Sequence, residues 1–177
     1  QAVEYDDLDG VIESINNGAD INATDEYKQS AIQIALQEEY YETVKLLLNY
    51  EVELDNELLN KTIAKDQLEI AKLLLERSVK IDGVDKDGWT ALTTAAYLSQ
   101  PDTLRWVLSH MPNVNVNKPD NNDSGLTALH HAACTGEVEK VKILLNAGAD
   151  IDAKDASGAT VKDWARDNGH LDVIQEL

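Results

Sequence analysis

Hydrophobic and polar positions recur along the chain in one order, which four segments share: 25–48, 85–108, 122–145 and 155–177. In its fullest form the order is D-x-x-G-x-T-A-L, two alanines or their equivalents, a turn, and then V-x-x-L-L. Thr127 and Thr160 hold the same place in neighbouring copies and lie 33 residues apart. Apolar residues at this spacing predict a short amphipathic helix on each side of the second turn.

Turn and capping residues stand where this pattern needs them. The Asp and Gly of D-x-x-G favour a tight turn, because glycine takes backbone angles that other residues resist. Thr90 and Thr127 then stand at the predicted helix starts, where a hydroxyl can cap free backbone N–H groups. Gly18 and Gly148 follow the second helix of a copy and are expected to stop it. Small side chains allow the helices to approach closely, notably Ala95, Ala96, Ala132 and Ala133.

Residues 127–153 carry the most complete copy, T-A-L-H-H-A-A followed by G-E-V-E-K-V-K-I-L-L-N-A-G-A-D-I-D-A. This segment resembles the ankyrin repeat, and the resemblance extends over the whole chain. It implies an all-α solenoid of stacked helix-turn-helix units with projecting hairpin loops, whose loops and inner helices form a concave face. We expect a single domain over residues 1–177, divided into six units: 1–23 (partial), 24–55, 56–82 (atypical and short), 83–116, 117–153 (with a loop insertion) and 154–177 (terminal).

Two units depart from the pattern. Leu48 and Leu75 lie only 27 residues apart, and the third unit lacks its D-x-x-G-x-T loop, which predicts a notch in the row of loops. The notch is a binding feature or sequence drift, and we favour drift. In the fifth unit, Thr90 and Thr127 lie 37 residues apart, and the extra residues predict an enlarged loop over 113–123. The terminal unit has Lys162 at an otherwise apolar position, as expected of a polar cap.

Acidic residues far outnumber basic ones, 33 against 15, for a net charge of −18. Such a chain repels phosphate polyanions and anionic lipid surfaces, so we expect neither a nucleic-acid nor a membrane partner. It attracts a basic protein from a distance, although the charge could equally serve solubility alone. Residues 1–55 hold most of the excess, with 14 acidic and 2 basic side chains.

Candidate chemistry is sparse. The single cysteine, Cys134, excludes an internal disulfide and fits a reducing compartment; with no apolar run of about 20 residues, we expect a cytoplasmic protein. The chain starts with Gln1, so processing or trimming could have removed a preceding segment. His130 and His170 stand where the resemblance implies structural hydrogen bonds. His130 and Cys134 could meet on one helix face, but a nucleophile also needs an orienting group, and a cysteine next to a structural histidine is the favoured interpretation. We therefore expect no enzyme, cofactor or metal site.

The resemblance implies that partner-facing residues lie in the loops and after the alanine pair. Trp89, Tyr97, Leu98 and Leu126 are aromatic or apolar at positions expected to be exposed, and Trp and Tyr are enriched at binding hot spots. A packing role for Trp89 against its neighbouring loop is the alternative. The candidate partner-binding residues are Glu26, Tyr27, Gln29, Gln37, Glu38, Lys86, Asp87, Trp89, Tyr97, Leu98, Ser124, Leu126 and Thr135.

Three functions remain open. The leading prediction is a monomeric, non-catalytic module that binds a partner protein with a basic patch on its concave face. The second is a self-contained inhibitor or immunity-type protein that blocks a basic enzyme. The third is the substrate-recruiting part of a larger multidomain enzyme or effector. Fold alone does not choose among partners.

Overall fold

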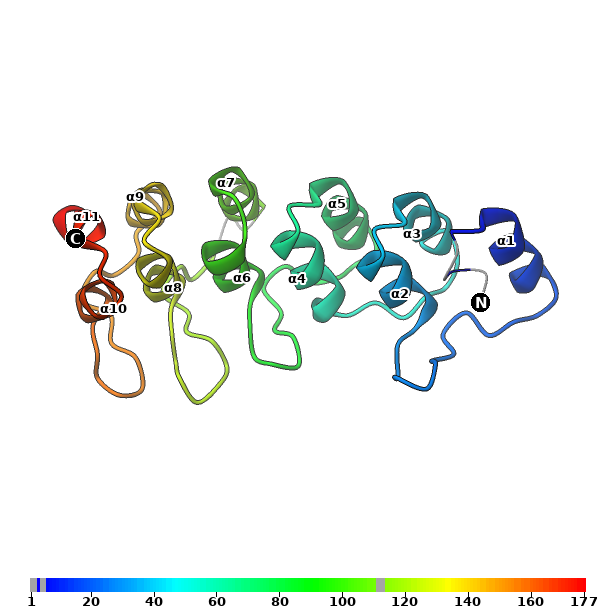
Figure 1. Cartoon of the computed structure of the whole chain (residues 1–177), viewed down its shortest axis with the longest axis horizontal. Coiled ribbons are helices and arrows are strands. Elements are labelled where there is room, and N and C mark those ends of the chain that lie inside the picture. Colours follow the sequence, from blue (N-terminus) through cyan, green and yellow to red (C-terminus); the bar gives the residue numbers. More distant parts are fainter. Residues whose placement is uncertain (1–2, 4–5, 111–113) are drawn as a thin grey trace.

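The chain forms an elongated stack of helix pairs, with α1 and α11 at opposite ends (Figure 1). The computed structural model describes residue 3 and residues 6–110 and 114–177. The other residues belong to the predicted first partial unit and to the end of the predicted fourth unit, where Asn113 also begins the predicted enlarged loop, so these parts of the predictions lie outside the described residues. The predicted all-α solenoid is confirmed.

Eleven helices cover the described residues, and each is six to nine residues long. None of these helices is long and apolar enough to cross a membrane. Even-numbered helices form an inner row, from which the loops project, and odd-numbered helices form an outer row (Figure 1). The helices are α1 (Leu8–Asn16), α2 (Ala31–Gln37), α3 (Tyr41–Leu47), α4 (Asn56–Ala64), α5 (Leu68–Glu76), α6 (Ala91–Leu98), α7 (Pro101–Ser109), α8 (Ala128–Thr135), α9 (Val138–Asn146), α10 (Val161–Asp167) and α11 (Leu171–Glu176).

Reciprocal capping fixes where the inner helices begin. At the start of α6, the Thr93 N–H donates to Thr90 Oγ1 over 3.1 Å, and the Thr90 N–H donates to Thr93 Oγ1 over 3.0 Å. Asp163 takes the second role at the start of α10, where its Oδ2 accepts from the Thr160 N–H over 3.0 Å. Such boxes satisfy backbone donors that a helix leaves free at its first turn. The predicted cap at Thr90 is confirmed.

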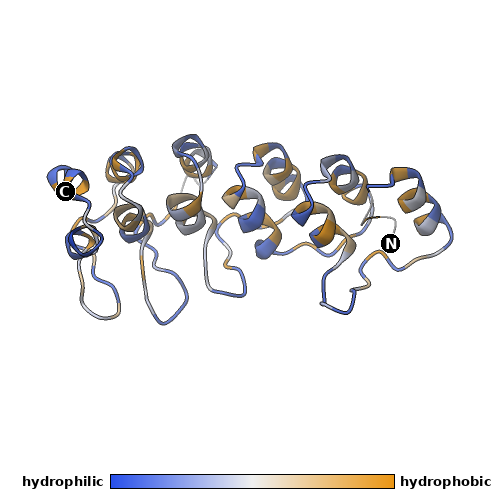
Figure 2. Ribbon diagram, in the orientation of Figure 1, coloured by the Kyte–Doolittle hydropathy of each residue, from blue (hydrophilic) through white to orange (hydrophobic). Residues whose placement is uncertain are grey.

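Small side chains let neighbouring units pack closely. The four alanines Ala95, Ala96, Ala132 and Ala133 are fully buried, and α6 packs directly on α8. The core continues through the outer row, and apolar residues gather on the helices while the loops are mainly hydrophilic (Figure 2). Lys140 is also fully buried: its Nζ donates to the Ala96 carbonyl over 3.1 Å and lies 3.0 Å from Glu137 Oε1. The lysine therefore links α9 to the end of α6.

The loops that enter α2, α6 and α10 project from the stack as fingers. One isolated bridge closes each of them at its base: Thr24 with Ser30, Val84 with Thr90, and Lys154 with Thr160. The connection into α4 does not project; it runs flat from α3, and Asp55 caps α4 by accepting the Leu58 N–H over 2.9 Å (Figure 1). The connection into α8 is longer and folds back, so that the Asp120 N–H donates to the Leu126 carbonyl over 2.8 Å.

Candidate protein-binding surface

Three rings meet where the 83–90 finger joins α6 and α8. The Trp89 ring centroid lies 4.6 Å from that of His131 and 5.6 Å from that of Tyr97, and the Tyr97 and His131 centroids are 5.4 Å apart. We call these residues the aromatic cluster. Trp89 is half-buried by this packing, whereas Tyr97 stays 39% exposed. Contact among the three rings therefore holds Trp89 and Tyr97 in place, so that they form one fixed aromatic surface.

A buried carboxylate holds the third ring. His131 Nε2 lies 2.7 Å from Asp120 Oδ2, and both side chains are shielded from solvent. Asp120 belongs to the connection that enters α8, eleven residues before the histidine. Its second oxygen, Oδ1, accepts no hydrogen bond from any described residue. The enlarged connection therefore contributes a side chain that orients the aromatic cluster from behind.

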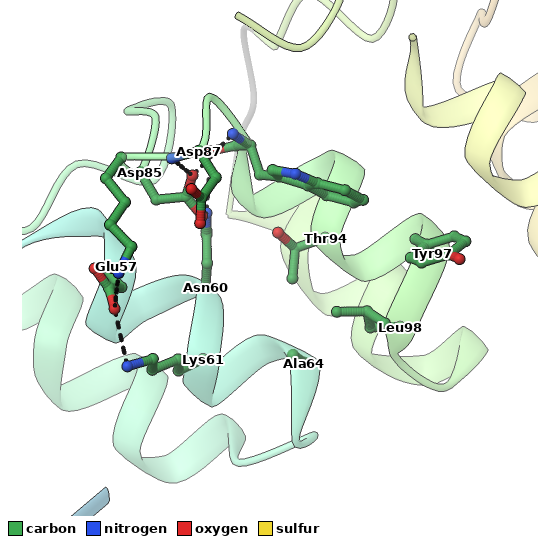
Figure 3. Close-up of a pocket in the computed structure, with 11 residues that line it drawn as sticks. Glu57, Asn60, Lys61, Ala64, Asp85, Asp87, Thr94, Tyr97 and Leu98 are labelled. Carbon is green, nitrogen blue, oxygen red and sulfur yellow. Dashed lines mark hydrogen bonds and ion pairs between the residues drawn. The ribbon is translucent and has the colours of Figure 1, made fainter. Parts of the chain in front are cut away.

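A pocket of about 420 Å³ opens between α4, α6 and the 83–90 finger (Figure 3). One wall is formed by the exposed side of α6, where Tyr97 and Leu98 lie, and the opposite wall by α4. Five of the predicted partner-binding residues meet here: Lys86, Asp87, Trp89, Tyr97 and Leu98. Sequence reasoning missed the other lining residues, which are Glu57, Asn60, Lys61, Ala64, Asp85 and Thr94.

Glu57 binds two lysines on the polar side of the pocket. Its Oε1 lies 2.9 Å from Lys61 Nζ, and its Oε2 lies 3.1 Å from Lys86 Nζ. Burial raises the pKa of Glu57, but the hydrogen bonds and charges of the two lysines outweigh it, so the pKa lies below its usual value. The hydrogen bond to Glu57, helped by its charge, in turn raises the pKa of Lys86. Glu57 and Lys86 are therefore both charged at neutral pH.

Asp85 and Asn60 fix the finger over the pocket. Asp85 Oδ1 accepts the backbone N–H groups of Asp87 and Trp89 over 3.0 and 2.9 Å. Asn60 is buried in α4, and its Nδ2 donates to Asp85 Oδ2 over 2.8 Å and to the Trp89 carbonyl over 3.0 Å. The carboxylate of Asp87 makes no hydrogen bond or ion pair with any residue that the structure describes, and it stays exposed. One carboxylate at the rim is therefore available to a ligand.

Leu126 does not belong to the exposed surface, and its prediction as an exposed position is wrong. The side chain is only 9% exposed. Its carbonyl accepts the Asp120 N–H, so the enlarged connection folds back on this residue. Trp89 holds the corresponding place before the helix cap in the preceding unit and is half-buried, because there the α4 side lacks a finger to cover it.

The remaining candidates lie away from the pocket. In the second unit the exposed side chains are those of Glu26, Tyr27, Gln37 and Glu38, with Tyr27 75% exposed. The half-buried Gln29 donates from its Nε2 to Gln37 Oε1 over 3.0 Å. In the fifth unit, Ser124 is exposed and Thr135 is half-buried. These residues extend the exposed surface along the row.

Histidine and cysteine side chains serve the scaffold. The Thr127 N–H donates to His130 Nδ1 over 3.2 Å, and burial lowers the pKa of His130. His170 Nε2 lies 2.9 Å from the Cys134 carbonyl oxygen in the preceding unit. Burial raises the pKa of the Cys134 thiol, which is the opposite of what activates a nucleophile. Within the described ranges no group of three or more His, Cys, Asp or Glu side chains could hold a metal ion.

Stacked helix pairs, projecting fingers and an open inner surface define a repeat scaffold of the solenoid class. A family model described as ankyrin repeats, three copies, matches residues 1–80, 57–120 and 114–177. The chain therefore belongs to the ankyrin-repeat family, as its sequence predicts. Ankyrin repeats are in general protein-interaction modules.

Several curated proteins are similar to parts of the chain. The B-cell lymphoma 3 protein homolog of Mus musculus is 36% identical over 110 residues, which is 62% of this chain and 25% of that protein. The zinc finger CCCH domain-containing protein 24 of Oryza sativa subsp. japonica is 51% identical over 72 residues, or 39% of this chain and 9% of that protein. The chain thus spans a quarter or less of the length of these relatives.

Proposed function

We propose that this chain is a non-catalytic module that binds a basic partner protein on the face formed by its fingers and inner helices. The carrying observation is the pocket, where exposed apolar side chains stand beside charged ones on a rigid scaffold. Tyr97 and Leu98 are 39% and 54% exposed there, and a contiguous apolar patch with a polar rim is typical of an interaction site. The aromatic cluster would anchor the partner at the middle of the stack.

Charge supports a basic partner. Residues 1–55 hold 14 acidic and 2 basic side chains, whereas residues 56–110 hold 8 and 7. The first two units would therefore attract a basic patch of the partner, while the pocket binds the partner at the middle of the stack. If this division holds, raising the salt concentration from about 50 to 500 mM slows association roughly tenfold or more, because long-range attraction is screened. A rate constant that does not change with salt would contradict the electrostatic part.

The relatives favour a module within a larger protein as the form in which it acts. Two of them contain a matching segment that makes up only 25% and 9% of their length. The recruiting part of a multidomain effector is therefore the second candidate. An inhibitor is distinguished from both by blocking an enzyme with these 177 residues alone. The proposed module is monomeric and cytoplasmic, and it takes no nucleic acid, membrane or cofactor.

Affinity capture with the whole chain tests the proposal. The Trp89→Ala/Tyr97→Ala double variant should capture at least about tenfold less partner protein than the parent chain, the effect expected of hot-spot aromatics. Leu171→Ala is the matched control, because Leu171 is 69% exposed on α11, far from the pocket. Circular dichroism must show that the double variant is folded. Retention of every partner by a folded double variant would show that the anchor lies elsewhere.

A further inference from the structure

The pocket exists because the third unit has no finger. Fingers enter α2, α6 and α10, but the flat connection into α4 leaves the side of the 83–90 finger uncovered. The pocket beside that finger is bounded by α4 on one side and by Tyr97 and Leu98 of α6 on the other (Figure 3). The short third unit therefore leaves a shaped cavity.

The two sides of this cavity differ in their chemistry. The α6 wall offers aromatic and aliphatic surface, and Trp89 of the finger adds a second ring 5.6 Å from that of Tyr97. The opposite wall and the rim carry three carboxylates, those of Glu57, Asp85 and Asp87, against two ammonium groups, so the pocket is net negative. Both ammonium groups are already paired with Glu57. Negative charge is therefore left over at the finger, next to the rings.

We propose that this pocket accepts an arginine side chain of the partner, with its guanidinium laid against Trp89 and Tyr97 and its charge directed to Asp87. The inference rests on the proposed function, since it specifies the partner's chemistry at the same surface. A guanidinium is planar, stacks on aromatic faces and donates hydrogen bonds from its edge, so it can contact the rings and the rim carboxylate at once. The unpaired Asp87 carboxylate supplies the acceptor.

Other occupants fit the walls less well. An acidic side chain meets a pocket that is already net negative in a chain of net charge −18. A purely aliphatic side chain would take the rim carboxylates out of water without compensation. A lysine ammonium is compact and strongly hydrated, so it cannot lie flat on the rings while reaching Asp87. Of these side chains, arginine alone matches the rings and the rim carboxylate together.

The test is a titration of the ¹⁵N-labelled whole chain with capped Gly-X-Gly tripeptides, in which X is arginine, lysine, citrulline or leucine. The ionic strength is kept constant with sodium chloride. The Trp89 indole N–H signal, assigned by its loss in Trp89→Leu, should move with the arginine peptide at up to about 20 mM, the range expected for a single side-chain contact. Lysine and citrulline should bind about three- to fivefold more weakly, because each lacks one half of the interaction.

Two matched variants distinguish the effect of the Asp87 carboxylate on binding from the effect of the chain's overall negative charge. Asp87→Asn should weaken the arginine peptide about three- to fivefold. Asp167→Asn removes an exposed carboxylate from the last unit and should leave binding unchanged. Equal shifts with arginine and leucine, no shift with arginine, or full binding by Asp87→Asn would each overturn the proposal. If partner capture still depends on Trp89 and Tyr97 in that case, the proposed function stands and only the arginine assignment fails.

Discussion

The two irregular connections flank the same finger and affect it in opposite ways. On the α4 side the missing finger leaves residues 83–90 uncovered, and the pocket opens there. On the α8 side the enlarged connection closes against them: the Asn121 N–H donates to the Gly88 carbonyl over 2.8 Å, and His131 stacks on Trp89. One deletion therefore supplies the opening, and one insertion supplies the support behind it.

The finger of the last unit shows what a regular finger has. Its Gly158 corresponds to Gly88, yet a side chain added at Gly158 would meet nothing within 4 Å, whereas one added at Gly88 would collide with the Asn121 backbone. Both fingers share the Asp-centred turn, with Asp85 and Asp155 each accepting two backbone N–H groups. The repeat thus determines the conformation of each finger. Only the 83–90 finger, between the two irregular connections, lines the pocket described above.

The largest expected effect comes from removing the buried support. Asp120→Ala leaves His131 buried without its partner, and we expect the free energy of unfolding to fall by about 3 kcal/mol, as when one member of a buried pair is lost. Urea denaturation followed by circular dichroism measures this change. The exposed, neighbouring Asp123→Ala should change it by less than about 0.5 kcal/mol.

Asp120→Ala also sharpens the comparison at the surface. With the support gone, the Trp89 indole signal should move even though no pocket residue has changed. The Trp164 indole, which donates to Asp155 Oδ2 over 2.9 Å in the last unit, should stay in place. An Asp120→Ala protein as stable as the parent, with an unmoved Trp89 signal, would show that the enlarged connection does not support the cluster.

The next effect tests the close contact between the finger and the enlarged connection. Gly88 and Gly158 have φ of +84° and +88°, so alanine at either site costs about 1 kcal/mol of backbone strain. Gly88→Ala must also displace the Asn121 carbonyl, and we expect a total loss of about 2 kcal/mol. Thermal or urea unfolding of the two variants side by side gives the difference. Equal losses would place the connection farther from the finger than the structure has it.

Local rules predict the scaffold well. Helix caps and alanine packing act within one unit or between adjacent units, and they recur with the 33-residue spacing that separates Thr127 from Thr160. They can therefore be predicted from the repeat alone. The same reading places Trp89 and Tyr97 near the surface, because their positions follow from the repeat. It also predicts the missing finger from the short third unit.

The site itself depends on how the irregular parts fold, which the repeat does not specify. Asp120 reaches His131 only because its connection turns back, and no spacing rule pairs a loop residue with a helix residue eleven positions later. The sequence held one signal for this contact: His131 is the only histidine at its position in the repeat, where other units have Ile34, Thr94 and Trp164. Leu126 is buried by the same turn. Glu57 lines the pocket because α4 has no finger in front of it.

The smallest expected effect is a pH dependence that differs between the last finger and the enlarged connection into α8. In the last finger, hydrogen bonds from Ser157 and Trp164, together with backbone N–H groups, outweigh burial and hold the pKa of Asp155 at about 2. In the enlarged connection the same turn is made by Asn122, whose Oδ1 accepts the Ser124 N–H over 3.1 Å and cannot titrate. Asp155 has a lower pKa in the folded than in the unfolded chain, so it stabilises its finger fully above pH 3.8. That contribution is lost as the pH falls towards about 2.

Amide hydrogen exchange measured between pH 5 and pH 2 should therefore show the Ala159 N–H, which donates to Asp155 Oδ1 over 2.9 Å, losing protection as the acid is protonated. The Ser124 N–H should keep its protection relative to the rest of its unit over the same range. In Asp155→Asn the last finger and the enlarged connection should respond alike, because an amide replaces the only titrating group in the turn. Parallel loss of protection at both places in the parent chain would mean that acid acts on the whole stack. The difference between Asp155 and Asn122 would then have no local consequence.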